Sequence, residues 1–198
     1  MGIKTIRGVG MNDADYNVTK SKKVNGKTII TWMCPFYLVW VSMLNRCYSA
    51  TVHKSHPSYK DCSVCDEWLI FSNFKAWMEQ QDWGDKQLDK DLLVEGNKVY
   101  SPDTCVFVHV KINNFIINRP RGRGEYLLGV HLNKRGNRFL SQCNNPFTGK
   151  REHVGSFMTE LEAHIAWKKR KHELACMLSE SEYCNDDRIK KVLLTRYN

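Results

Sequence analysis

The chain has 198 residues, of which 42% are hydrophobic and 26% are charged, and its formal net charge is +9. This length is sufficient for one large domain or two small ones, each with its own core, and the apolar fraction excludes a wholly disordered chain. No apolar run reaches the roughly 18 residues of a membrane span and the N-terminus lacks an apolar signal core, so we expect a cytoplasmic protein that does not bind membranes.

Charge is distributed unevenly along the chain. Residues 1–60 contain nine basic and two acidic side chains, residues 61–104 contain four and ten, and residues 105–198 contain 17 and nine. An acidic centre between two basic segments is typical of a metal-binding or exposed centre flanked by segments that contact phosphates. An uneven but ordinary solvated surface gives the same distribution. Charge alone leaves both interpretations open.

The N-terminal third is expected to be extended and then helical. Residues 1–31 form a basic segment with a hairpin turn at Val24-Asn25-Gly26-Lys27, because Asn-Gly readily takes the positive φ angles of a two-residue loop. Pro35 suits the first turn of a helix, since its missing N–H would be unpaired there anyway. The apolar spacing predicts a helix from Phe36 to Tyr48, a polar loop from Ala50 to Lys60 and a second helix from about Asp66 to Gln80.

Eight cysteines in a cytoplasmic chain argue against a disulfide framework. Cys62 and Cys65 have the spacing with which two thiolates bind one tetrahedral zinc ion. A closed site needs two more ligands, and no second Cys-x-x-Cys is present. We therefore favour the interpretation that both thiols belong to the core, with a structural zinc site as the alternative.

The middle of the chain is expected to form two strands and a short helix before a linker. The strands are Gln87–Leu92 and Thr104–His109, separated by a loop with Gly96-Asn97, and the helix lies near Val110–Ile117. Residues 118–125 lack apolar side chains and contain proline and two glycines, which is typical of a linker. Its arginines, Arg119, Arg121 and Arg123, could also lie along phosphates or in a minor groove.

The C-terminal segment has a β-β-β-α pattern. The strands are predicted at Tyr126–Asn133, Arg138–Cys143 and Arg151–Phe157. A helix begins at Thr159, because Thr159 and Glu162 can form a capping box by bonding each other's backbone N–H, and it continues past Cys176. A further short helix is expected around Arg188–Leu194.

This segment also resembles a known DNA-binding family. The residues that carry the resemblance are Gly129-Val130-His131, Arg138-Phe139, Val154-Gly155-Ser156-Phe157 and the helix start at Thr159–Ala163. Over about residues 124–176 they are similar to the AP-two (ethylene-response-factor) domain, in which a three-stranded antiparallel sheet lies in the major groove and is backed by one helix. The chain departs from the plant members at His131, Asn133 and His153, where those have Arg and Trp, so the resemblance does not define a target sequence.

The resemblance implies that one sheet face binds double-stranded DNA. Alternation of side chains assigns base-edge contacts to one face and helix contacts to the other. The expected base-reading residues are His131, Asn133, Arg138, Gln142, Asn144, Arg151 and His153, and Val130, Phe139, Val154 and Phe157 face the helix. Lys134, Arg135 and Lys150 lie at strand ends, where contact with phosphates is expected.

Residues 32–117 resemble the phage HNH homing-endonuclease-like proteins. The resemblance rests on Leu88-Asp89-Lys90-Asp91-Leu92, Gly96-Asn97-Lys98, Tyr100-Ser101-Pro102, Thr104-Cys105-Val106-Phe107 and Asn113-Asn114. Helical residues before them, including Trp40, Met43-Leu44, Arg46-Cys47-Tyr48, Cys65-Asp66-Glu67-Trp68, Phe71 and Phe74, are also similar to these proteins. The family has a ββα-metal finger that cleaves DNA.

The HNH resemblance implies a role for each matching residue. Asp89 on the first strand and Asn113 or Asn114 on the helix would bind Mg²⁺ or Mn²⁺ against the scissile phosphate, and Asn97 would be the central asparagine. Lys90 stands where the general-base histidine is expected, and a lysine with an ordinary pKa is protonated at neutral pH and cannot accept a proton. Lys90 would instead stabilise phosphate charge. Asp91, expected on the same strand face as Asp89, and His109 are further catalytic candidates.

The sequence thus predicts an α+β protein with two modules. The first, residues 1–117, is a helical region with an HNH-like ββα-metal finger; after the linker, residues 126–178 form a three-stranded antiparallel sheet packed on one helix, and residues 179–198 form a tail. The function expected is that of a phage-type DNA-binding protein, acting as a homing-type HNH-like endonuclease or nickase in the bacterial cytoplasm. A catalytically inactive DNA-binding regulator or anti-host factor is the first alternative, and an interaction or virion protein that does not bind DNA is the second. Oligomeric state is left open.

Overall fold

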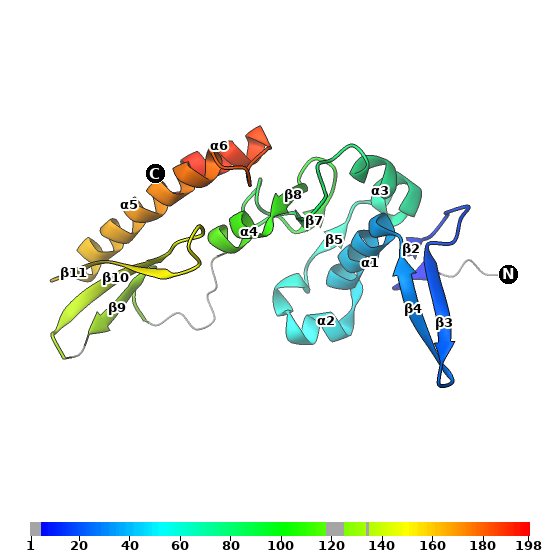
Figure 1. Ribbon diagram of the computed structural model, residues 1–198, viewed down its shortest axis with the longest axis horizontal. Helices are drawn as coiled ribbons and strands as arrows, with labels where there is room; N and C mark the ends of the chain where they lie inside the picture. The colour runs from blue at the N-terminus through cyan, green and yellow to red at the C-terminus, as the bar shows by residue number, and fades with distance from the viewer. Residues whose placement is uncertain (1–4, 118–124, 134) are drawn as a thin grey trace. The chain divides into compact units, whose positions relative to one another are not determined.

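The structure, a computed structural model, describes residues 5–117, 125–133 and 135–198 (Figure 1). The chain divides into two compact units, Met1–Phe107 and Val108–Asn198, whose positions relative to one another are not determined. Both units contain helices, and the small sheets are mostly antiparallel, so the predicted mixed α and β class is confirmed. Of the predicted linker, only Glu125 is among the described residues.

The first unit begins with two hairpins of antiparallel strands. Strand β1 (Thr5–Ile6) pairs with β2 (Gly10–Met11), and β3 (Thr19–Val24) pairs with β4 (Lys27–Met33). Between β3 and β4, Asn25 and Gly26 have φ angles of 50° and 76°. These are the positive values that a two-residue hairpin turn requires, so the turn predicted at this position is confirmed.

Helices make up most of the remaining first unit. Helix α1 (Pro35–Tyr48) begins with proline in its first turn, as predicted. The predicted polar loop after it is wrong in part, because it contains helix α2 (Ala50–Ser55) and a 3-10 turn η1 (Pro57–Tyr59). The second predicted helix is also interrupted: it consists of a 3-10 turn η2 (Asp66–Leu69), an extended residue Ile70 and helix α3 (Phe71–Met78).

Aromatic side chains form the core of the first unit. Trp40 on α1 and Trp68 on η2 are fully buried, and the Trp40 indole Nε1 donates a hydrogen bond to the Trp68 carbonyl oxygen at 2.7 Å. Phe74 on α3 contacts Trp68 edge to face with ring centroids 5.1 Å apart. Burial of aromatic side chains of this size supplies most of the hydrophobic stabilisation that a small unit can gain.

Short strands follow, and the last of them, β8, contains the boundary between the two units, which lies after Phe107. Strand β5 (Ser63–Val64) pairs in parallel with β7 (Val99–Tyr100), and β6 (Lys86–Asp89) pairs with β8 (Val106–His109). The second unit then continues with helix α4 (Val110–Ile116), near the predicted position.

The rest of the second unit is a three-stranded sheet followed by two helices. The antiparallel sheet has the order β11–β10–β9, with β9 at Val130–Asn133, β10 at Arg138–Asn144 and β11 at Arg151–Phe157. Helix α5 (Glu160–Ser179) contacts all three strands, and α6 (Asp187–Thr195) packs against α5. The predicted capping box is confirmed, since the Thr159 hydroxyl accepts from the Glu162 N–H and the Glu162 carboxylate accepts from the Thr159 N–H.

Among the residues that the structure describes, no helix is both long enough and apolar enough to cross a membrane.

Candidate nucleic-acid interface

One side of the β9–β10–β11 sheet is occupied by α5. Ser141 and Cys143 of β10 are buried on this side. Glu152 of β11 accepts a hydrogen bond from the Arg170 Nε on α5 at 2.9 Å and another from the Asn145 amide at 2.6 Å. These bonds from Arg170 and Asn145 lower the pKa of Glu152, so its carboxylate stays ionised on the helix side of the sheet.

The opposite side, called here the outer face, follows from the strand register. Directly opposed residues share a face, and the register pairs Arg138 with Asn133 and Asn144 with Arg151. The outer face consists of His131, Asn133, Arg138, Leu140, Gln142, Asn144, Arg151, His153 and Ser156. It therefore includes every strand residue that the sequence predicts to read bases, and most of these side chains are exposed.

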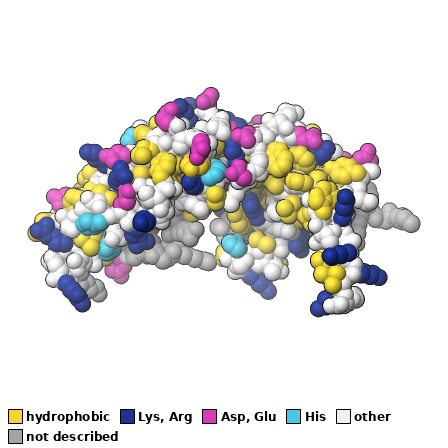
Figure 2. Space-filling model, in the orientation of Figure 1, with side chains coloured by type: hydrophobic (Ala, Val, Ile, Leu, Met, Phe, Trp, Pro, Cys, Tyr) yellow, Lys and Arg dark blue, Asp and Glu magenta, His cyan; other side chains and the backbone are white. Residues whose placement is uncertain are grey.

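The outer face carries positive charge without a carboxylate. From Tyr126 to Met158 the sequence has five basic residues and one acidic residue, Glu152, which is bound on the helix side. Basic and histidine side chains gather over this part of the second unit in Figure 2. Such a surface favours an anionic partner by charge complementarity.

The loops between the strands extend this basic surface. Arg135, in the β9–β10 turn, and Lys150, at the β10–β11 turn, are exposed. Asn145 fixes the second turn because its Oδ1 accepts the backbone N–H groups of Phe147 and Thr148 at 2.8 and 3.2 Å. The other expected phosphate contacts lie outside the described residues: Arg119, Arg121, Arg123 and Lys134.

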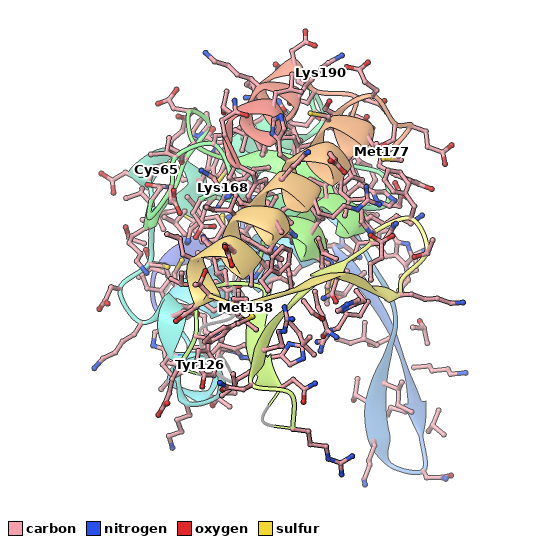
Figure 3. All side chains as sticks on the ribbon, turned by 90° about the vertical axis from the view of Figure 1, so that its left-hand side faces the viewer. Cys65, Tyr126, Met158, Lys168, Met177 and Lys190 are labelled. Carbon is pink, nitrogen blue, oxygen red and sulfur yellow. The ribbon has the colours of Figure 1, made fainter. Side chains whose placement is uncertain are left out.

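Figure 3 looks onto the second unit and shows α5 crossing the strands, with Lys168 and Met177 labelled on the helix. The packing of the sheet on α5 requires a close approach at Gly129, next to β9. A Cβ atom built there would lie 1.9 Å from the Trp167 ring of α5, and Gly129 has a φ of +77°. Only glycine meets both requirements, so this position fixes how β9 lies against the helix.

The second candidate site surrounds Asp89 at the end of β6. The Asp89 Oδ1 accepts the backbone N–H groups of Asp91 and Leu92 at 3.0 and 2.7 Å. These two hydrogen bonds to the Asp89 side chain end strand β6 at Asp89. Asp91 lies beyond the strand, so the expectation that it shares a strand face with Asp89 is wrong. Burial raises the pKa of Asp89, and the negative charge of Asp91 raises it further.

Lys90 and Asn97 hold the loop after β6 closed. The Lys90 side chain is buried, and its Nζ donates to the Asn97 carbonyl oxygen at 3.0 Å and lies 3.1 Å from the Asp91 carboxylate. The Asn97 amide donates to the carbonyl oxygens of Lys90 and Val99, both at 2.7 Å. Both side chains therefore stabilise the loop, and the Lys90 ammonium is engaged within it.

The remaining residues of the predicted finger lie in or next to α4. The His109 Nδ1 accepts the N–H of Lys111 and so caps the helix, and the imidazole stacks on Tyr183 with ring centroids 4.7 Å apart. Asn113 is partly buried and Asn114 is exposed on α4. Both lie in the second unit, whereas Asp89 lies in the first.

The residues expected to bind Mg²⁺ or Mn²⁺ are divided between the two units, with Asp89 in the first and Asn113 and Asn114 in the second. In the described part of the chain, no three or more His, Cys, Asp or Glu side chains are grouped so that they could hold an ion. Near Asp89, the neighbouring carboxylate of Asp91 is paired with the Lys90 ammonium.

Cys62 and Cys65 flank β5 within the first unit. Cys62 is buried and Cys65 is partly buried, and burial raises the pKa of both thiols. The Cys62 Sγ contacts the Ser58 carbonyl oxygen at 3.8 Å. Cys62 belongs to the buried hydrophobic cluster of this unit and Cys65 packs against that cluster.

Comparison of the chain with models of protein families, with curated proteins and with solved structures found no match.

Sequence reasoning did not assign a role to some exposed residues. Leu140 of β10 and Ser156 of β11 lie directly opposite each other, and both belong to the outer face. The β3–β4 hairpin has a further signal, because Lys20 and Lys22 alternate with other residues just before the Asn25-Gly26 turn. This alternation is the signal that places them on one face of a hairpin.

Proposed function

We propose that the protein binds double-stranded DNA through the outer face of the β9–β10–β11 sheet. The observation that carries the proposal is the strand register, which gathers Arg138, Arg151, Gln142 and Asn144 on the face opposite α5. The absence of a carboxylate among the outer-face residues supports the same conclusion, because an acidic side chain there would repel phosphates.

The strand architecture and the side chains of this face suit a major groove. A β-ribbon fits a groove that is about 12 Å wide, and arginine, asparagine and glutamine side chains can form paired hydrogen bonds with base edges. Arg135 and Lys150, in the connections on either side of β10, would contact phosphates and fix the orientation of the sheet.

Alanine substitution at Arg138 and Arg151 tests this proposal. Each single variant is expected to weaken duplex binding roughly tenfold, the loss of about one good base or phosphate contact. Fluorescence anisotropy with a labelled duplex measures the affinity. Lys191→Ala is the matched control, because it removes one positive charge from an exposed position on α6 and should bind like the wild type.

Wild-type affinity in both arginine variants would contradict the choice of face. Failure of the wild-type protein to shift any duplex at moderate salt would contradict DNA binding itself. That result would favour the class of interaction or virion proteins that do not bind DNA.

Cleavage of the bound DNA with Mg²⁺ or Mn²⁺ is a second candidate function. It is supported by the order of elements β6, a loop, the short strand β7, β8 and α4, and by the bonds with which Asn97 closes the loop. The burial and pairing of Lys90 weigh against a direct role for its ammonium at a phosphate. The alternative is a DNA-binding regulator or anti-host factor that does not cleave.

A nicking assay separates these two functions. We expect Asp89→Asn to abolish any nicking of supercoiled plasmid in Mg²⁺ or Mn²⁺. The asparagine side chain lacks the negative charge but keeps the oxygen that accepts the N–H groups of Asp91 and Leu92. The control is Asp61→Asn, at an exposed position. No nicking by the wild type with either metal would favour the regulator, and nicking that persists in Asp89→Asn would contradict the role of Asp89.

A further inference from the structure

The β3–β4 hairpin has an unusually exposed surface within the first unit. Figure 1 shows it extending beyond α1, and nearly all of its side chains are exposed. Large apolar side chains are among the exposed ones: the exposed fraction is 46% for Ile29, 55% for Ile30 and 43% for Trp32. A two-stranded hairpin is only marginally stable by itself in water, so apolar groups left uncovered on both strands indicate a surface that a partner covers.

The register sorts the hairpin side chains into two different faces. Lys20 opposes Trp32, Lys22 opposes Ile29, and Val24 opposes Lys27. These six residues therefore share one face, called here the ribbon face. The other face carries a single lysine, Lys23, with Thr28 and Ile30 among its neighbours. Cations and apolar side chains thus alternate along the ribbon face.

A β-bulge maintains this arrangement at the base of the hairpin. The register shifts between Lys20 and Ser21, so that Thr31 is the additional residue in β4, and its hydroxyl donates to the Lys20 carbonyl oxygen at 3.2 Å. As a consequence, Trp32 lies beside Lys20 on the ribbon face, with the Lys20 Nζ 5.5 Å from the ring centroid. Bulges commonly redirect a side chain in this way next to functional surfaces.

Charge identifies the chemistry of the partner. From Tyr16 to Met33 the sequence contains four lysines and no acidic residue. In the part of the chain that the structure describes, no carboxylate pairs with these lysines, whereas Lys75, Lys86 and Lys190 do form ion pairs. The dark-blue side chains at the end of the hairpin in Figure 2 show this concentration of charge.

We infer that the ribbon face is a second DNA-contacting element, with Lys20, Lys22 and Lys27 against backbone phosphates and Trp32 and Ile29 against sugars or base edges. Three cations spaced along a twisted ribbon match the repeated charges of a phosphodiester backbone, and β-ribbons enter DNA grooves. The choice of DNA over another polyanion rests on the proposed function. An anionic membrane and a second copy of the chain are the other occupants that the test separates.

The salt dependence of duplex binding tests the inference on the full chain. The variant carries Lys20→Gln, Lys22→Gln and Lys27→Gln together, and the control carries Lys54→Gln, Lys60→Gln and Lys191→Gln at exposed sites elsewhere. The slope of log K against log salt should decrease by about 0.9 for each lysine that contacts a phosphate. At about 0.1 M salt we expect the hairpin variant to bind tenfold or more weakly, while the control keeps the wild-type slope and affinity.

A second hairpin variant, with arginine at the same three positions, should keep the wild-type slope because the charge is retained. Circular dichroism verifies that both variants fold. An unchanged slope in the glutamine variant would overturn the inference but leave the proposed function standing, provided that Arg138→Ala and Arg151→Ala still weaken binding. Weaker binding in the glutamine variant with no effect at Arg138 or Arg151 would support the inference and contradict the outer-face proposal. No duplex binding by the wild type would overturn both.

Two parallel measurements test whether the hairpin binds another partner in place of duplex DNA. Vesicles of phosphatidylcholine and phosphatidylglycerol test a membrane surface, and analytical ultracentrifugation tests self-association. Loss of vesicle binding, or of a dimer, in the glutamine variant with unchanged duplex affinity would overturn the inference.

Discussion

Gly129→Ala is expected to destabilise the protein by about 2–5 kcal/mol. An alanine Cβ would overlap the Trp167 ring at 1.9 Å, and the residue would have to keep a φ of +77°. Overpacking of this kind costs roughly 1–3 kcal/mol and a left-handed conformation for a residue other than glycine about 1–2 kcal/mol more. Urea unfolding followed by circular dichroism measures the free energy of unfolding.

Gly149→Ala is the matched control for this effect. Gly149 has a similar φ of +68°, but a Cβ atom there has no neighbour within 4 Å. Its substitution should therefore cost only about 1–2 kcal/mol, the cost of holding alanine in a left-handed conformation. Equal losses at the two positions would show that Trp167 does not pack closely against Gly129.

The Gly129 position connects stability to the proposed interface. The Gly129 carbonyl accepts the N–H of Gln142 at 2.8 Å, and the preceding carbonyl of Leu128 bonds the His164 Nδ1 on α5 at 2.9 Å. A change at Gly129 thus moves β9 relative to β10 and α5. We expect the variant to lose duplex affinity together with stability, whereas Arg138→Ala should reduce affinity alone.

Local chemistry made some elements predictable from the sequence. The Asn25-Gly26 turn and the Thr159–Glu162 capping box depend on residues within four positions of each other. Strand β11 has its predicted bounds, Arg151–Phe157. In each case the information needed lies within a short segment, and tertiary contacts agree with it.

Contacts with other elements explain the errors. The helix predicted from Asp66 is interrupted because Asp13, 59 residues away, caps α3: its Oδ1 accepts the Ser72 N–H at 2.9 Å and its Oδ2 the Ser72 hydroxyl at 2.6 Å. In α2, His53 bonds the Arg46 carbonyl oxygen on α1 at 2.9 Å, a contact that the polar composition of this segment does not reveal. Periodicity cannot identify such partners.

The candidate interface was partly predictable for the same reason. Alternation assigned the outer-face residues, but their true alignment includes a bulge opposite Ser141 and Gln142, where Val154 is the additional residue of β11. The bulge returns Phe157 to the side of Phe139, its partner in the register. Around Asp89, the residue types are visible in the sequence, whereas the burial of Lys90 depends on the closed loop and is not.

The buried lysine of α5 gives the second large expected effect. The Lys171 Nζ donates to the Phe115 carbonyl oxygen of α4 at 2.6 Å and lies 3.4 Å from the Phe115 ring centroid. Burial lowers the pKa of Lys171 from 10.5 to about 8; the charge of Arg196 acts in the same direction, and Cys143 opposes it. The ammonium thus anchors α4 to α5 at a desolvation cost.

This lowered pKa determines how stability should change with pH. Between about pH 8 and 10.5 the unfolded chain holds the Lys171 proton more tightly than the folded chain does, so the Lys171 contribution to the free energy of unfolding should increase as pH rises. The increase is complete above the unfolded pKa and is lost as pH falls through about 8. Its upper limit, from a pKa difference of about 2.5, is about 3 kcal/mol.

Lys171→Met isolates this contribution, because methionine has a similar length and does not titrate. We expect urea unfolding under reducing conditions to show that the wild type gains about 1–3 kcal/mol relative to Lys171→Met between pH 7 and pH 10. The thiols and tyrosines of the chain titrate in both proteins. Their effects therefore largely cancel in the difference between the free energies of unfolding of the wild type and the variant. Parallel stability curves would mean that the Lys171 ammonium keeps an ordinary pKa, and that the contact between α4 and α5 does not desolvate it.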